Sequence, residues 1–114
     1  MENDEKAYIP KNLDETILQL DKEFDDSTKQ SIIEMNEMDF ICDLHFSTGM
    51  WIRNNWGLWG GADLTNYFNN LGGHHPDDMS SIILTCYYRH LKHQAYELDK
   101  QIRYYQDYLK KETL

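Results

Sequence analysis

Four side chains that can bind a transition metal gather within the segment His74-His75-Pro76-Asp77-Asp78. Neighbouring side chains on a helix point about 100° apart, whereas the ligands of structural metal sites stand three or four residues apart so that they converge. We therefore interpret this segment as a helix start, with a histidine as the cap, Pro76 at the first position, and Asp77 and Asp78 facing the positive end of the helix dipole. His90 and His93 lack a carboxylate nearby in the sequence, so we predict no bound metal.

A second candidate for chemistry is Arg53, which lies in the most apolar part of the chain. It can belong to a ligand pocket, whose walls we predict as Trp51, Trp56, Trp59, His74, His75, Asp77 and Asp78. It can instead belong to a structural network, because a buried guanidinium is costly unless a carboxylate and hydrogen bonds satisfy it. The network is favoured, since no nucleophile with an adjacent base accompanies the arginine. We expect Arg53 to be buried and paired with Asp63, Asp77 or Asp78.

The net charge of −9 is concentrated in the first third of the chain. Residues 1–39 hold 12 acids against 4 lysines, a balance of −8, whereas residues 40–114 hold 8 acids against 7 basic residues, a balance of −1. Such a surface repels nucleic acids and anionic membranes and favours a basic protein partner, although a solubilising face would look the same. The candidate partner-binding residues cluster near the end of the predicted first helix: Asp21, Glu23, Asp25 and Asp26.

Apolar spacings of three and four recur along the chain, and no alternating strand pattern is present, so we predict an all-α fold of about five helices. We expect a single domain over residues 8–114 and a disordered N-terminus over residues 1–7. Asn12 caps the first predicted helix, Ser27 the second, and Asn36 a third that continues through Ile52. Residues 57–61 form a tight turn, a short helix covers 62–70, and Gly72 with Gly73 ends that helix.

The last predicted helix carries an apolar stripe with alternating steps of four and three: Leu84, Tyr88, Leu91, Ala95, Leu98, Ile102, Tyr105 and Leu109. The first helix has the same spacing, so the two are expected to pack as an antiparallel pair. A continuous helix over residues 77–111 would be about 50 Å long, whereas a domain of this size is about 35 Å across. The helix must therefore kink or protrude, and we place the break at Lys92-His93-Gln94.

Cys42 and Cys86 stand alone in apolar stretches, so we expect buried, reduced thiols that bind no metal. The charged N-terminal residues do not form a secretory signal, and no run of 18 apolar residues occurs. These features predict a cytoplasmic protein.

Three segments of the sequence are distinctive: Tyr8-Ile9-Pro10-Lys11-Asn12-Leu13, GMWIRNNWGLW over residues 49–59, and HPDDMSSIIL over residues 75–84. With these segments the chain resembles a family of small bacterial proteins described only as a domain of unknown function. The resemblance covers about residues 8–110. It implies a bacterial origin and an independent small domain, and it brings no established activity, cofactor or catalytic residue.

Three functions are open at this point. The favoured one is a protein-binding module, most concretely an immunity or antitoxin-like protein that neutralises a basic toxin through its acidic N-terminal third; this is an analogy in general character. The second is an enzyme or small-ligand binder that uses the pocket around Arg53, and the third is a homodimeric structural protein joined by the stripe of the last helix. The first is favoured because the charge is uneven and no catalytic constellation is present. For this protein-binding function we predict no catalytic residue, no cofactor and no bound metal.

Overall fold

The computed structural model describes residues 8–72 and 75–113, which form seven α-helices and no strand. The all-α class is therefore confirmed for these residues. The predicted disorder of residues 1–7, Gly73 of the predicted helix end and His74 of the predicted pocket lie outside the described residues. The helices are α1 (Leu13–Glu23), α2 (Asp26–Glu34), α3 (Glu37–His45), α4 (Thr48–Asn55), α5 (Asp63–Asn70), α6 (Pro76–Leu91) and α7 (Leu98–Thr113).

Side-chain caps fix the starts of α1 and α3 as predicted. The Oδ1 of Asn12 accepts the backbone N–H of Glu15 at 3.0 Å, and the Oδ1 of Asn36 accepts that of Asp39 at 2.8 Å. Each bond satisfies one of the backbone donors that a helix start leaves without an internal partner. The polar residues before each apolar stripe thus set where these helices begin.

The predicted helix from Asn36 through Ile52 is divided into α3 and α4. The backbone leaves the helical region at Ser47, where φ is −110° and ψ is −89°. A continuous helix would use the carbonyl of His45 internally, whereas here that oxygen accepts Nη2 of Arg53 at 3.2 Å. The break therefore provides a partner for a buried guanidinium, which helical periodicity does not reveal.

The glycine-rich segment after α4 forms the predicted turn over residues 57–61. Gly57 has a φ of 72°, in the left-handed region that favours glycine, and a Cβ there would lie 2.7 Å from the Cβ of Ala62. The hydroxyl of Thr65 on α5 donates to the Gly57 carbonyl at 2.7 Å. The turn is therefore fixed to the helix that follows it, and Gly72, with a φ of 93°, follows the last residues of α5 as predicted.

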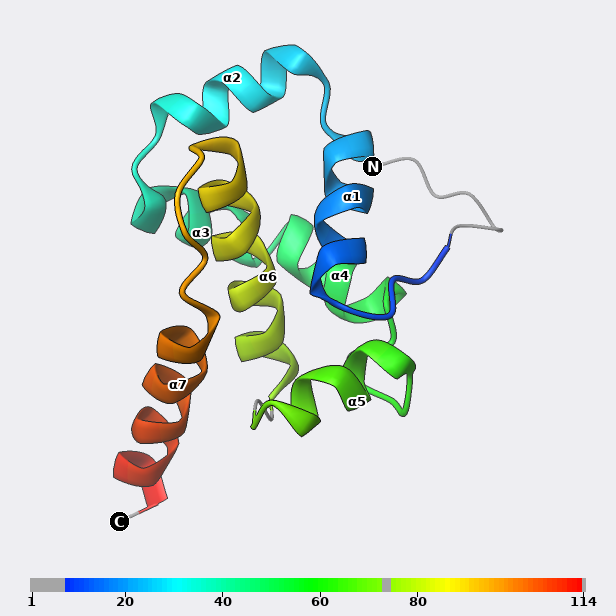
Figure 1. The fold of residues 1–114 in the computed structure, drawn as a ribbon, viewed down its shortest axis with the longest axis vertical. Coiled ribbons are helices and arrows are strands. Elements are labelled where there is room, and N and C mark those ends of the chain that lie inside the picture. Colours follow the sequence, from blue (N-terminus) through cyan, green and yellow to red (C-terminus); the bar gives the residue numbers. More distant parts are fainter. Residues whose placement is uncertain (1–7, 73–74, 114) are drawn as a thin grey trace.

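α6 is the central helix of the fold, and α1, α2, α3, α4 and α7 all pack against it (Figure 1). Every residue from Met79 to Tyr88 is buried, so this helix faces other helices on all sides. The core that surrounds it includes Leu20 of α1, Phe40 of α3, Ile52 of α4 and Phe68 of α5, each with no exposed surface. No helix within the described ranges is long and apolar enough to cross a membrane.

The break predicted at Lys92-His93-Gln94 is confirmed, and it is a reversal of the chain. α6 ends at Leu91, and His93 adopts a φ of 57°. The N–H of His93 bonds the carbonyl of His90 at 3.2 Å, and the N–H of Gln94 bonds that of Arg89 at 2.8 Å. This pair of bonds is the Schellman motif that ends many helices, here with a histidine in place of the usual glycine.

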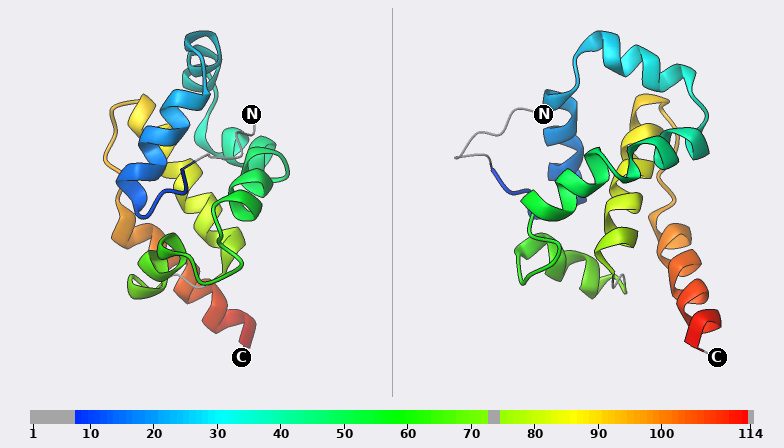
Figure 2. Two further views of the ribbon diagram at one scale, coloured as in Figure 1. Left: turned by 90° about the vertical axis from the view of Figure 1, so that its right-hand side faces the viewer. Right: turned by 180° about the vertical axis from the view of Figure 1, so that it is seen from behind.

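The predicted antiparallel pairing of the first and last helices is not what the structure has. α1 packs on α6, and both helices ascend in Figure 1, whereas α7 descends beside α6 and extends past its start (Figures 1 and 2). Because the turn after α6 sends the chain back, α7 takes the antiparallel position next to α6. Of the predicted stripe, Leu84, Tyr88 and Ile102 are buried, whereas Ala95 is exposed, and the spacing did not predict which helices pair.

The two cysteines differ in exposure. Cys86 on α6 is buried as expected, but Cys42 on α3 is exposed. Phe40 occupies the inward position of α3, and a residue two places further along a helix points about 200° away from it. The expectation of two buried thiols is therefore wrong for Cys42.

Candidate functional site

Arg53 of α4 forms the buried polar network that the sequence predicts. Its side chain is 6% exposed, and Nε lies 3.3 Å from Oδ1 of Asp77. Nη1 donates to the Ser80 hydroxyl at 2.8 Å, and Nη2 donates to the His45 carbonyl at 3.2 Å. Each guanidinium nitrogen thus has a partner, from the end of α3 or the start of α6, so Arg53 ties three helices together.

The other residues of the predicted Trp-lined pocket fall into two groups. Trp56 is 2% exposed and packs edge-on against the half-buried Trp51 at 5.7 Å between ring centroids. Trp59 is 60% exposed and lies edge-on to His75 at 5.8 Å. One pair therefore belongs to the core and the other to the surface.

The segment from His75 to Asp78 begins α6 in the way the sequence predicts. Nδ1 of His75 accepts the backbone N–H of Asp77 at 3.0 Å, and Pro76 is the first residue of the helix. Asp77 and the half-buried Asp78 follow in its first turn. Across the described part of the chain, no three histidine, cysteine or acidic side chains are grouped so as to hold a metal ion.

Two of the four predicted partner-binding acids, Asp21 and Asp25, have structural roles. Oδ1 of Asp21 lies 3.1 Å from Nζ of Lys29 and accepts the Tyr87 hydroxyl at 3.3 Å. Asp25 accepts the backbone N–H of Thr28 at 2.8 Å and so caps α2, which corrects the predicted cap at Ser27. Hydrogen bonds from the backbone and then the side chain of Thr28 lower the pKa of Asp25, because they stabilise the carboxylate.

The other two predicted acids, Glu23 and Asp26, are exposed, and their side chains form no ion pair with any residue in the described ranges. They belong to a larger set of exposed carboxylates, which we call the acidic arch because α2 bridges α1 and α3 above the end of α6 (Figure 1). The acidic arch consists of Glu23, Asp25, Asp26, Glu34, Asp39 and Asp43. Lys11, Lys22 and Lys29 are the basic residues of α1, α2 and their approach, and Lys29 is already paired with Asp21.

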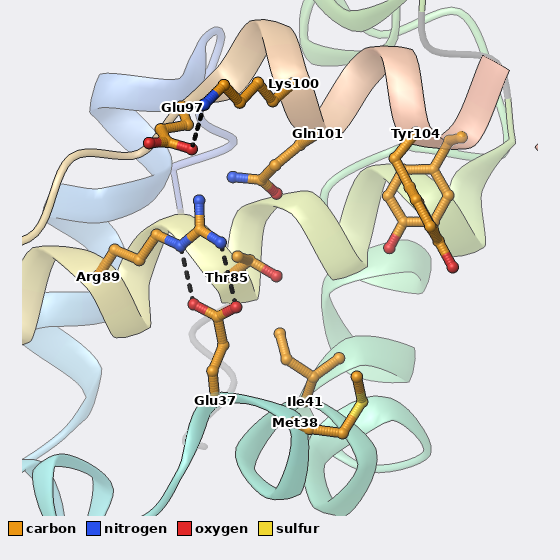
Figure 3. Close-up of a pocket in the computed structure, with 10 residues that line it drawn as sticks. Glu37, Met38, Ile41, Thr85, Arg89, Glu97, Lys100, Gln101 and Tyr104 are labelled. Carbon is orange, nitrogen blue, oxygen red and sulfur yellow. Dashed lines mark hydrogen bonds and ion pairs between the residues drawn. The ribbon is translucent and has the colours of Figure 1, made fainter. Parts of the chain in front are cut away.

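A groove of about 480 Å³ runs between α3 and α7, with α6 as its floor (Figure 3). Its charged end is an ion pair in which Nε and Nη2 of Arg89 donate to the two carboxylate oxygens of Glu37 at 2.8 and 3.1 Å. The third nitrogen, Nη1, donates to the Tyr96 carbonyl at 2.6 Å. Arg89 of α6 therefore links α3 to the segment before α7, and each of its guanidinium nitrogens donates a hydrogen bond.

The rest of the groove is mostly apolar, with Met38 and Ile41 on the α3 wall and Tyr104 and Tyr105 on the α7 wall. Met38 is 70% exposed and Tyr104 is 64% exposed. Methionine and tyrosine are enriched at protein interfaces, because each offers a large contact area. The sequence does not predict this groove, since the groove exists only when α7 folds back beside α6, and none of the four residues has an unusual sequence context.

These features describe a small all-helical domain with a fully satisfied polar network inside it, an acidic surface over its first three helices and an apolar groove beside α7. The chain belongs to the family described as a domain of unknown function (DUF6794), which matches residues 9–91. No curated protein and no solved structure matches the chain. The family match covers α1 to α6 and ends at the last residue of α6, so α7 and the α7 wall of the groove lie beyond it.

Proposed function

We propose that the chain is a protein-binding module that holds a basic partner against the acidic arch, in the manner of an immunity or antitoxin protein of the bacterial cytoplasm. One observation carries the proposal: Glu23 at the end of α1 and Asp26 at the start of α2 are both exposed and form no ion pair within the described residues. Carboxylates arranged in this way are available to a cationic surface.

The position of Glu23 is unfavourable for the isolated fold, because it is the last residue of α1, where the helix dipole repels negative charge. Asp26 is in the first turn of α2, where the dipole favours negative charge. Exposed charges add little to stability, but they raise the association rate with an oppositely charged protein. A binding role accounts for the placement of Glu23, which folding does not favour.

Charge alone gives steering more than affinity, so a bound partner also needs apolar contacts. Met38 lies on α3, next in sequence to Glu37 and Asp39, and Tyr104 lies across the groove from it (Figure 3). We therefore expect the partner to contact the acidic arch and to place an apolar side chain at the α3 edge of the groove.

The test starts with a tagged copy of the chain, purified from its native cell, and with identification of the protein that remains bound. The purified partner is then titrated against wild type and against the double variant Glu23→Lys, Asp26→Lys. Asp21 and Asp25 are left intact because they pair with Lys29 and cap α2. The matched control is Asp99→Lys, Asp107→Lys, which makes the same change of charge at two exposed acids of α7.

We expect a basic partner whose dissociation constant rises at least about tenfold for the α1–α2 double variant and changes little for the α7 control. Equal affinities for all three proteins, or a partner with no basic surface, would contradict the proposal. Circular dichroism of each variant shows whether the fold is retained, so that a loss of binding is not confused with unfolding.

A further inference from the structure

The turn between α6 and α7 is made of residues that also suit a continuous helix. Residues 92–97 read Lys-His-Gln-Ala-Tyr-Glu and contain neither glycine nor proline. The apolar stripe that begins at Leu84 continues through Leu91, Ala95 and Leu98 in unbroken heptad spacing. Local sequence therefore favours one long helix, whereas the structure has two helices folded against each other.

The backbone of this turn is strained at both ends. His93 has a φ of 57° and Glu97 a φ of 52°. Within the described part of the chain, every other residue with a positive φ is a glycine. This left-handed conformation is unfavourable for a residue with a side chain. Straightening the turn into helix would relieve both residues at once.

The contacts that hold α7 in place come almost entirely from α6 and the turn before it. Ile102 packs into the core and is 6% exposed. Nε2 of Gln101 lies 3.5 Å from Sγ of Cys86. Further along, Nε2 of Gln106 donates to the carbonyl of Gly72 at 3.3 Å. Nothing in these contacts requires that α7 and α6 belong to the same copy of the chain.

We infer that α7 is an exchangeable arm: residues 92–97 straighten, α6 and α7 become one helix, and the α7 of each copy docks on the α6 of a second copy. The joined helix over Pro76–Thr113 would be about 57 Å long, which exceeds the 44 Å longest dimension of the folded chain. A straightened α7 therefore leaves its own α6 and exposes Ile102. A second copy supplies the surface that covers it, because it presents the identical vacated face.

Charge permits this pairing although the chain as a whole is acidic. α7 carries four basic and three acidic residues, a balance of +1, whereas residues 1–39 carry the balance of −8. The exchanged arm therefore brings none of the repulsive charge into the interface. This inference does not depend on the proposed function, since it concerns a second copy of the chain and not a basic partner.

The experiment compares two measurements on the full chain. The protein is refolded from denaturant at low and at high concentration, and the mass in solution is measured by light scattering. Spin labels are then placed at Asn70→Cys and Asp107→Cys, both exposed, in a Cys42→Ser background, and labelled protein is diluted with an excess of unlabelled chain so that only distances within one chain are seen. In the folded-back form the labels are close, because Gln106 contacts Gly72.

We expect refolding at high concentration to yield dimers in which the distance within one chain lengthens to about 45 Å, the span of a helix from the start of α6 to residue 107. His93→Gly with Glu97→Gly should weaken dimerisation on the order of 100-fold, because glycine favours the turn and disfavours the helix. Ala95→Gly is the matched control and should weaken it less, since it disfavours the helix without relieving a positive φ. A monomeric mass under every condition, or dimers that keep only the short distance, would overturn the inference.

Discussion

Arg53 and the acids at the corner of α1 and α2 illustrate opposite uses of charge in one small domain. The guanidinium is buried and each of its nitrogens has a partner, whereas Glu23 and Asp26 face solvent without an ion pair among the described residues. The first arrangement contributes to the fold and the second leaves charge available for binding.

Replacing Arg53 with alanine should lower the free energy of unfolding by about 3–5 kcal/mol, because it leaves buried polar groups of α3 and α6 without their donors. Asp77→Asn should cost about 1 kcal/mol or less, since the Asp77 side chain is 47% exposed and water can replace the ion pair. Urea unfolding monitored by tryptophan fluorescence gives both values. A loss of only a few tenths of a kcal/mol for Arg53→Ala would mean that the network is not structural.

Acid sensitivity should arise in part from the carboxylates of Asp25 and Glu15. Hydrogen bonds from Thr28 lower the pKa of Asp25, and those from the Lys11 amide and the Tyr8 hydroxyl lower the pKa of Glu15. A lowered folded-state pKa means that the stabilisation is present above the unfolded values of 3.8 and 4.5 and is lost as pH falls through the folded values. In the double variant Asp25→Asn, Glu15→Gln, the unfolding midpoint should decrease less than in wild type as the pH is lowered from about 5 to about 2. An unchanged slope would show that these carboxylates are not responsible.

The two thiols should react at very different rates. Burial raises the pKa of Cys86 to about 11, so little thiolate is present at neutral pH, whereas Cys42 is exposed. A thiol reagent should therefore modify one cysteine rapidly in the native protein and the second only after denaturation. Cys42→Ser should abolish the rapid phase; if the rapid phase persists, Cys86 is accessible and the described packing of α6 is wrong.

At the scale of elements, the turn after α6 contains His93 and Glu97, the two residues other than glycine that have a positive φ in the described part of the chain. The sequence predicts a break because a helix over residues 77–111 does not fit a small domain, and it places the break at Lys92-His93-Gln94 because that stretch has no large apolar residue. The structure has the break there. Helical spacing cannot predict that the chain reverses, because the same stripe serves a straight helix and a folded-back pair. The split between α3 and α4 was missed for a related reason: it depends on Arg53, which reaches His45 across the break.

His93→Gly should raise the free energy of unfolding by about 0.5–1 kcal/mol, since glycine adopts the required positive φ without steric cost. Gln94→Gly is the control, because that residue does not have a positive φ and gains nothing from the change. Thermal unfolding at low concentration, where the chain is monomeric, compares the two. A destabilising effect of His93→Gly as large as that of Gln94→Gly would show that the positive φ is not a source of strain.

At the scale of the whole molecule, composition and periodicity are sufficient to predict an all-α domain and the inward face of α1, since that helix has to bury its apolar stripe. They do not predict that α6 is buried on every side from Met79 to Tyr88. They do not predict the groove between α3 and α7, which requires two segments distant in sequence to lie on either side of α6 (Figure 3). Of the four acids chosen from the sequence, spacing could not separate Asp21 and Asp25 from Glu23 and Asp26. Their roles depend on Lys29 and on the start of α2.

If the acidic arch holds a basic partner, as we propose, the affinity must depend strongly on salt concentration. Titration calorimetry of the co-purified partner at several salt concentrations gives the slope of log Kd against log salt for wild type and for Glu23→Lys, Asp26→Lys. We predict a steep rise of Kd with salt for wild type, and for the variant weaker binding at low salt with a shallower slope, because two attractive charges have become repulsive. Equal dissociation constants and equal slopes for the two proteins would contradict the claim.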